Sequence, residues 1–129
     1  MQQIAHITLL VNDYDEAIEF YTTKLQFRVV EDKIMSETKR WVLIAPPGST
    51  GTSLLLTKAT TDIQRNLVGN QAGGKVCMFL FTDNISEDYQ NLLHHEVEII
   101  EQPEVKQHGK VLIFADLYGN RYDLIEPNK

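Results

Sequence analysis

The sequence has few cysteines, no long apolar run and no signal-peptide pattern, and each of these absences excludes a class of protein. A single cysteine, Cys77, among 129 residues excludes an internal disulfide and a cysteine-rich zinc module. No apolar run approaches the roughly 20 residues that a membrane-spanning helix needs. The first ten residues lack the basic start of a signal peptide, and their apolar stretch ends at Asn12 and Asp13. We therefore expect a soluble protein that works in the cytoplasm and has no membrane partner.

Basic residues are also scarce. Twelve Lys and Arg stand against eighteen Asp and Glu, which gives a net charge of −6. Phosphate contacts are made mainly by Lys and Arg, so this balance argues against a nucleic-acid partner. The hydrophobic fraction of 43% is ordinary for a globular protein, and the length suits one domain. We expect residues 1–129 to form a single domain.

Strand and helix patterns alternate along the first half of the chain. Residues 4–11 are rich in β-branched side chains and short enough for a strand. Asn12 and Asp13 then suit the start of a helix, because Asx side chains cap helix N-termini. Apolar residues recur after them at helical spacing, at Ala17, Ile18, Tyr21 and Leu25. Further strands are predicted at residues 27–30, 40–45 and 52–57.

The second half repeats this order after a polar connection. Residues 58–74 are weakly patterned and end in two glycines, so we expect them to join the halves. The halves would then cover about residues 1–57 and 75–129. A strand is predicted at 76–81, a helix at 85–94, and strands at 97–100, 111–114 and 121–125.

The two halves also match in register. HITLLVNDYDEAIEFY starts at residue 6, and CMFLFTDNISEDYQNL starts 71 positions later. At this offset Asn12 corresponds to Asp83, and Glu16 corresponds to Glu87. After the helices, the segments around LQFRVV and EVEIIE correspond at an offset of 70. Neither half alone would bury its sheet, so we predict an α+β fold made of two βαβββ repeats.

Three motifs, taken together with this repeat, resemble a known superfamily. They are H-I-T-L-L-V-N-D near the start, F-L-F-T-D-N-I at mid-chain and F-A-D-L-Y-G-N-R-Y-D-L-I-E-P at the end. In this order the chain resembles, over essentially its whole length, the vicinal oxygen chelate proteins, which include glyoxalases, bleomycin-resistance proteins and extradiol dioxygenases. The resemblance implies mixed sheets that curl around a central cavity for a small molecule. It also implies a homodimer, in which paired chains or swapped halves complete the site.

Metal-dependent members of that superfamily bind a divalent ion through four inward residues. The resemblance places these positions at His6, Leu55, Cys77 and Asp123. Leu55 stands where glutamate is usual and cannot donate, and Cys77 stands where histidine is usual. Three ligands, His6, Cys77 and Asp123, remain for zinc, nickel, iron or manganese, but the set is incomplete and no cofactor is certain.

The resemblance implies a catalytic role for His6 and Asp123, although each residue also has a structural interpretation. His6 shares a strand face with Ile4 and Thr8, so it lines a wet cavity or is a core histidine bonded to the backbone. Asp123 alternates with Arg121 and Ile125. If the Asp123 carboxylate is buried it needs a partner, for which His6 and Arg40 are the candidates.

Four further residues are predicted to bind the substrate: Arg40, Trp41, Leu55 and Cys77. Arg40 can hold a carboxylate through two hydrogen bonds, and Trp41 can cover an apolar or aromatic ligand. Trp41 would equally suit a core or a dimer interface. Cys77 more often serves as a small hydrophobic residue than as a nucleophile.

Three functions are compatible with this pattern, and whether the protein is an enzyme stays open. The favoured hypothesis is a glyoxalase- or bleomycin-resistance-like protein with a small-molecule pocket and a degenerate metal site. The second is a metal-dependent lyase or isomerase resembling lactoylglutathione lyase. The third is a resistance protein that sequesters a drug without chemistry, with which the charge of −6 is loosely consistent.

Overall fold

A computed structural model describes all 129 residues, and the chain divides into two compact units. Unit 1 is Met1–Val68, and unit 2 is Gly69–Lys129. The division falls within residues 58–74, where the sequence analysis expected the connection. None of the helices is both long and apolar enough to cross a membrane.

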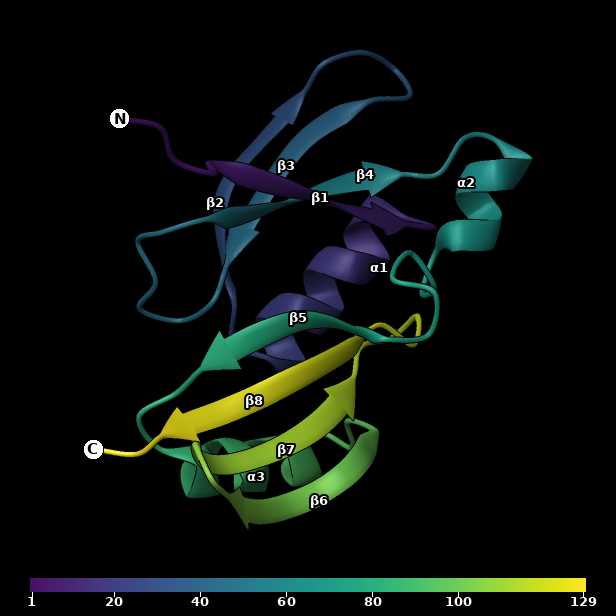
Figure 1. Cartoon of the computed structure of the whole chain (residues 1–129). Helices are drawn as coiled ribbons and strands as arrows, with labels where there is room; N and C mark the ends of the chain where they lie inside the picture. Colours follow the sequence, from purple (N-terminus) through teal and green to yellow (C-terminus); the bar gives the residue numbers. More distant parts are fainter. The chain divides into compact units, whose positions relative to one another are not determined.

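Unit 1 is a four-stranded mixed sheet, and a helix follows its first strand along the chain (Figure 1). The strands lie in the order β1-β4-β3-β2, with β1 parallel to β4 and the other pairs antiparallel. Helix α1 contacts β3 and β4 and so covers one face of the sheet. The elements are β1 (His6–Val11), α1 (Tyr14–Glu19), a π-helical turn η1 (Phe20–Lys24), β2 (Arg28–Ile34), β3 (Arg40–Ala45), β4 (Ser53–Lys58) and α2 (Asp62–Leu67).

The core of unit 1 lies between this sheet and α1. Successive strand residues point to opposite faces, so every second side chain reaches the helix. Except for Ile7, the apolar ones of β1, β3 and β4 are fully or almost fully buried, as are the helical residues that meet them. They are Leu9, Val11, Val42, Ile44, Leu54, Leu56, Ala17 and Tyr21. The sheet face opposite α1 is called the distal face of unit 1.

Unit 2 repeats the arrangement of unit 1 (Figure 1). Its strands lie in the order β5-β8-β7-β6, with β5 parallel to β8 and the other pairs antiparallel. Helix α3 contacts β8 and covers one face. The sheet face opposite α3 is the distal face of unit 2. The elements are β5 (Val76–Phe81), α3 (Ile85–His94), β6 (Ile99–Lys106), β7 (Gly109–Ala115) and β8 (Arg121–Pro127).

Aromatic and aliphatic side chains fill the core of unit 2. The Phe114 and Tyr122 rings of adjacent strands stack with centroids 5.0 Å apart and planes 8° apart. Leu112 and Leu124 are buried beside them, and α3 contributes Ile85 and Leu92. Offset-stacked rings add to the stability that their buried area gives. This core fixes the position of β8, which carries Asp123.

Helix caps confirm the internal repeat and explain its change of offset. The Glu16 N–H donates to Asp13 Oδ2 over 2.8 Å, and the Glu87 N–H donates to Asn84 Oδ1 over 3.1 Å. The two capping residues are thus 71 positions apart, and so are the two donors. Past the helices, Gln26 and Glu96 both have left-handed backbone, with φ of 60° and 57°, and they are 70 positions apart. The first repeat therefore holds one residue more, and the wider π turn η1 accommodates it.

Three elements differ from the sequence-based expectation. Strand β2 continues to Ile34, although the prediction ended it at residue 30, because it pairs with β3 along that length. Helix α2 forms within residues 58–74, where no helix was predicted. It begins with a capping box, in which Thr61 Oγ1 accepts from the Gln64 N–H over 3.1 Å and the Gln64 side chain accepts from the Thr61 N–H. Strand β6 continues to Lys106, although the prediction ended it at residue 100. Its polar second part forms a strand because it pairs with β7.

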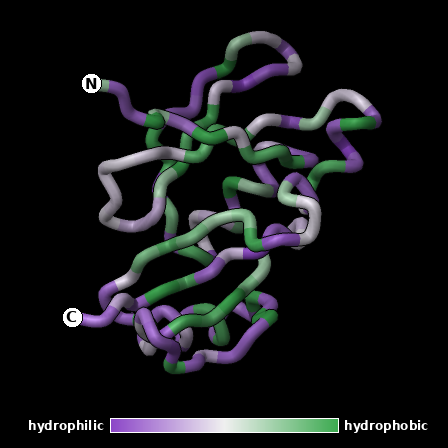
Figure 2. The backbone as a smooth tube through the Cα atoms, in the orientation of Figure 1, coloured by the Kyte–Doolittle hydropathy of each residue, from purple (hydrophilic) through white to green (hydrophobic).

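The fold class is confirmed as α+β, with two βαβββ repeats that each form an open four-stranded sheet. Figure 2 shows the chemical difference among the strands of unit 2: β5 and β7 are largely hydrophobic, whereas β6 is largely hydrophilic. Strand β6 is an edge strand with two register shifts and a proline, Pro103. Such features keep edge strands from pairing with other chains.

Candidate functional site

On the distal face of unit 1, two of the predicted site residues meet. His6 of β1 and Trp41 of β3 form an edge-to-face pair, with ring centroids 5.9 Å apart and planes at 80°. His6 is exposed and Trp41 is half-buried, so both rings are accessible from solvent. Leu55 of β4 pairs in register with Thr8 of β1 and with Leu43 of β3. The face thus combines a histidine, an indole and aliphatic side chains.

Arg40 lies on the opposite side of this sheet. Its guanidinium donates to Asp15 Oδ1 of α1 over 2.7 Å and to Asp32 Oδ2 of β2 over 2.6 Å. It also stands over the Tyr14 ring, 5.4 Å from the centroid. These carboxylates raise the pKa of Arg40, so the side chain stays charged. Arg40 joins α1 to the sheet, and the structure does not bring it together with His6 and Trp41.

The distal face of unit 2 carries Asp123 among apolar side chains. Asp123 lies in register with Phe79 of β5 and Ile113 of β7. Ile125, two residues along β8, lies in register with Phe81 and Val111. Phe79 is 65% exposed and Phe81 is 79% exposed, although both are large aromatic residues. Sequence analysis missed these two phenylalanines.

The surroundings of the Asp123 carboxylate disfavour its charged form. Its Oδ1 atom is buried and has no hydrogen-bond partner. Burial raises the pKa of Asp123, an effect that Lys106 opposes and Glu101 reinforces. Lys106 makes no ion pair with it. A buried acceptor without a donor destabilises the fold, so this arrangement is unusual.

Another aspartate of unit 2 shows what a structural carboxylate looks like. Asp116 is buried in the turn between β7 and β8. Its Oδ1 accepts from the backbone N–H groups of Tyr118 and Asn120, each over 2.9 Å, and its Oδ2 accepts from Asn120 Nδ2 over 2.8 Å. Both carboxylate oxygens of Asp116 therefore accept hydrogen bonds within the fold, whereas Oδ1 of Asp123 accepts none.

Cys77 lies at an irregularity of β5. The register shifts between Val76, which pairs with Arg121, and Met78, which pairs with Tyr122. Cys77 is the additional residue of this bulge, so strand alternation alone does not fix where its side chain points. Burial raises the pKa of the Cys77 thiol, and the nearby Asp116 raises it further. A raised pKa favours the thiol over the thiolate that binds metals.

The donor set does not fit the superfamily's divalent metal. Leu55 offers no donor atom, and burial raises the pKa of Cys77 and of Asp123, which disfavours the charged forms that bind metals. Within neither unit do three His, Cys, Asp or Glu side chains gather into a group suited to a metal ion. A catalytic metal needs at least three such ligands.

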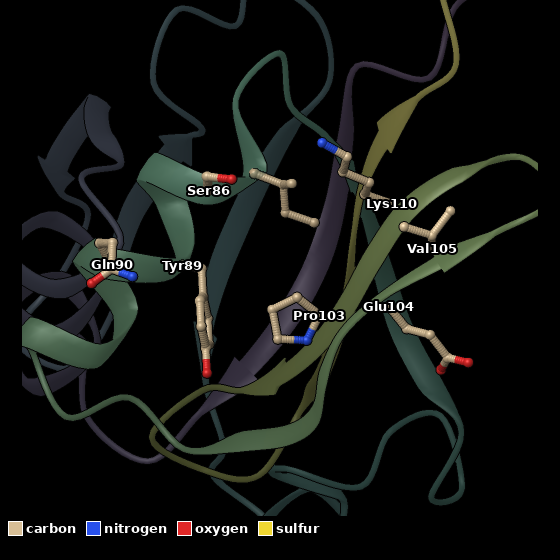
Figure 3. Close-up of a pocket in the computed structure, with 8 residues that line it drawn as sticks. Ser86, Tyr89, Gln90, Pro103, Glu104, Val105 and Lys110 are labelled. Atoms are coloured by element: carbon tan, nitrogen blue, oxygen red, sulfur yellow. The ribbon is translucent and has the colours of Figure 1, made fainter.

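Unit 2 also has a small hollow away from these residues. It lies between α3 and the β6–β7 hairpin, where Tyr89 faces Pro103 (Figure 3). Its volume of about 190 Å³ is smaller than the roughly 300–1,000 Å³ of most ligand pockets. None of the predicted site residues lines it.

The chain belongs to the Glyoxalase/Bleomycin resistance protein/Dioxygenase superfamily, whose family model matches residues 3–124. This confirms the resemblance found in the sequence. An uncharacterized protein of Shewanella frigidimarina (strain NCIMB 400) is 48% identical over 128 residues, covering 98% of this chain and 95% of the relative.

Solved structures of other proteins share the fold. The crystal structure of UcmS2 is 26% identical with a TM-score of 0.85, and the match covers 98% of each chain. TnmS3, an antibiotic binding protein from Streptomyces sp. CB03234, is 24% identical with a TM-score of 0.79, covering 99% of this chain and 98% of TnmS3. The TnmS3 likeness establishes the fold alone.

Proposed function

We propose that this protein binds a small apolar or aromatic organic molecule and does so without the superfamily's divalent metal. One observation carries the proposal: the distal face of unit 2 leaves Phe79 and Phe81 mostly exposed beside Ile113 and Ile125. Apolar patches of this kind on soluble proteins commonly mark binding sites. Aromatic rings also provide large, rigid contact surfaces for ligands.

The distal face of unit 1 supports the same proposal. His6, Trp41 and Leu55 offer an aromatic and aliphatic surface with one polar group, which is the usual composition of a small-molecule site. In this proposal Trp41 and Leu55 contact a ligand on the distal face of unit 1, and Arg40 does not. His6 supplies the polar contact on that face, and Asp123 supplies the polar contact on the distal face of unit 2. Cys77 acts as a small hydrophobic residue.

Lyase or isomerase chemistry of the lactoylglutathione lyase kind is not supported. Such a reaction uses a metal to polarise adjacent substrate oxygens, and the residues here do not provide its ligands. Sequestration of a drug is the second candidate, because TnmS3, which has the same fold, is described as an antibiotic binding protein. The protein would then release the bound drug chemically unchanged.

A homodimer acting in the cytoplasm forms part of the proposal. The exposed apolar face of unit 2 suits contact with a second copy as well as with a ligand. Size-exclusion chromatography at several protein concentrations measures whether two copies associate. Association would indicate that this face contacts a second copy, and a monomer at every concentration would leave the face to a ligand.

The proposal is tested with the fluorescent apolar probe 1-anilinonaphthalene-8-sulfonate and the Phe79→Ser/Phe81→Ser variant. We expect at least about tenfold weaker binding, because each ring removed takes away contact area worth about 1 kcal/mol. Val105→Ser is the matched control, since Val105 is 76% exposed in the same unit but lies on β6 outside the apolar rows. Equal binding by both variants would refute the proposal.

The metal-free part has its own measurement. Chelator-treated protein and a His6→Ala variant are unfolded thermally with zinc, nickel, iron(II) and manganese. A site saturated at 100 times its Kd would stabilise the protein by about 2.7 kcal/mol. We expect no shift from any ion. A shift that disappears in His6→Ala would restore the metalloenzyme hypothesis.

A further inference from the structure

The small hollow of unit 2 lies on the sheet face that α3 covers, opposite the distal face. Tyr89 of α3 and Pro103 of β6 stand on two sides of it, and the buried side chain of Ile85 also lines it (Figure 3). The Tyr89 hydroxyl donates to Gln102 Oε1 over 2.6 Å, which fixes the orientation of the tyrosine ring. The fold thus holds a largely apolar space with ring-shaped walls, as preformed ligand sites do.

The size of the hollow suits a single aromatic ring. Its volume is about 190 Å³, and an apolar cavity of roughly 150 Å³ is large enough to hold benzene. A flat ring placed between Tyr89 and Pro103 would pack against both walls. The larger probe 1-anilinonaphthalene-8-sulfonate, with its fused rings and anilino group, exceeds this space.

Lys110 of β7 brings a positive charge to the hollow. It lies in register with Glu126 of β8, and both side chains lie on the α3 face because Glu126 Oε1 accepts from the Ile85 N–H over 2.9 Å. Lys110 Nζ is 4.0 Å from Glu126 Oε2, which is too long for a hydrogen bond, and the lysine side chain is 54% exposed. The ammonium group can therefore donate to a ligand that enters the hollow.

The nearby carboxylates leave this charge in place. Glu104 lies in register with Val111, which pairs with Ile125 on the distal face, so the Glu104 side chain points to the other side of the sheet. Figure 3 shows it directed away from Tyr89 and Pro103. The charge of Glu126 is offset by the N-terminus of α3, whose N–H it accepts. The hollow therefore favours an anionic group over a cationic one.

We propose that this hollow is a second binding site of unit 2 and that it takes a small aromatic carboxylate. The ring lies between Tyr89 and Pro103, and the carboxylate accepts a charge-assisted hydrogen bond from Lys110 Nζ. This site goes beyond the proposed function, because it lies on the opposite face of the sheet and depends on neither Phe79 nor Phe81. Ligands of this size bind weakly, in the millimolar range.

Benzoate and benzamide test the proposal, because they have nearly the same shape and differ in charge. Each is titrated into the isotope-labelled full chain up to about 20 mM, and the backbone amide shifts in NMR spectra give both the affinity and the place of binding. We expect the largest shifts in the α3 amides around Ser86 and Tyr89. Benzoate should bind about fivefold more tightly than benzamide, the gain that one half-exposed ion pair provides.

Two variants separate the contribution of the charge from that of the ring. In Lys110→Met, which keeps the length of the side chain, we expect benzoate to bind no better than benzamide. Lys75→Met is the matched control, because Lys75 is an exposed lysine of the same unit that does not line the hollow, and it should keep the wild-type preference. Tyr89→Leu should weaken both probes about threefold, because it replaces one ring wall. Circular dichroism verifies that each variant is folded.

The outcomes bear on this site separately from the proposed function. Equal affinities of the wild-type protein for the two probes, or a benzoate preference that survives in Lys110→Met, would overturn the proposal. So would the absence of shifts, or shifts confined to the β5 amides around Phe79 and Phe81. Each of these results leaves the proposed function to its own test, which uses 1-anilinonaphthalene-8-sulfonate and the Phe79→Ser/Phe81→Ser variant.

Discussion

Replacing Asp123 with asparagine should make the protein more stable. The substitution keeps the shape of the side chain and removes the charge that burial disfavours. A buried polar atom without a partner costs about 1–3 kcal/mol, and more when its group is charged. Asparagine still leaves that atom unpaired, so the substitution relieves only the excess cost of the charge. Asp123 as a whole is only half-buried, and its second oxygen can still meet water, so we expect a gain near the lower end, about 1 kcal/mol. For a domain of this size that raises Tm by roughly 3–5 °C.

The gain should depend on pH in a defined direction. The folded pKa of Asp123 is raised above the ordinary value of 3.8, so the folded protein holds its proton at higher pH than the unfolded chain does. Wild-type stability therefore falls as pH rises from 3.8 through the raised pKa, and stays reduced above it. The advantage of Asp123→Asn should be full at neutral pH and should vanish below the ordinary pKa.

Urea titration followed by circular dichroism measures both effects. Asp83→Asn is the control, because substitutions of exposed residues usually change the free energy of unfolding by less than about 0.5 kcal/mol. A variant no more stable than the wild type at neutral pH would refute the reasoning. So would an advantage that grows as the pH is lowered.

Three further predictions concern the other residues of interest. Arg40→Met should lower stability by about 1 kcal/mol and leave ligand affinity unchanged, whereas Arg65→Met, which breaks only an exposed pair with Asp62, should change stability by less than about 0.5 kcal/mol. A loss of affinity in Arg40→Met would restore its predicted substrate contact. Cys77 should react with Ellman's reagent at pH 8 at least about fivefold more slowly than glutathione, because its raised pKa reduces the thiolate fraction; an equal rate would contradict this. Deletion of Thr23 should turn η1 into regular α-helix with a loss below about 2 kcal/mol, measured by circular dichroism and thermal unfolding. Deletion of Gln90 from the regular helix α3 should be far more damaging, and equal effects would refute the explanation of the repeat offset.

Part of the site could be predicted from the sequence and was not. Adjacent strand residues point to opposite faces, so Arg40 and Trp41 could not both line one surface. The same rule would have grouped Phe79 and Phe81 on one face of β5. The superfamily's metal positions fall on Leu55 and Cys77, and the aromatic residues beside Asp123 are not among those positions.

The sequence by itself determined the repeat. Local signals sufficed for it: Asx caps at Asp13 and Asn84, alternating strands, and an offset that changes from 71 to 70 because one helix holds an extra residue. Such signals are encoded within a few residues of where they act.

Only the tertiary structure decided which polar groups the fold satisfies. Asp116 and Asp123 both lie in the motif F-A-D-L-Y-G-N-R-Y-D, and nothing in that string distinguishes their roles. The turn supplies three donors to Asp116, whereas the neighbouring strands place Phe79 and Ile113 beside Asp123. Hydrogen bonding and desolvation depend on residues far apart in the chain, so these properties emerge only when the strands pair.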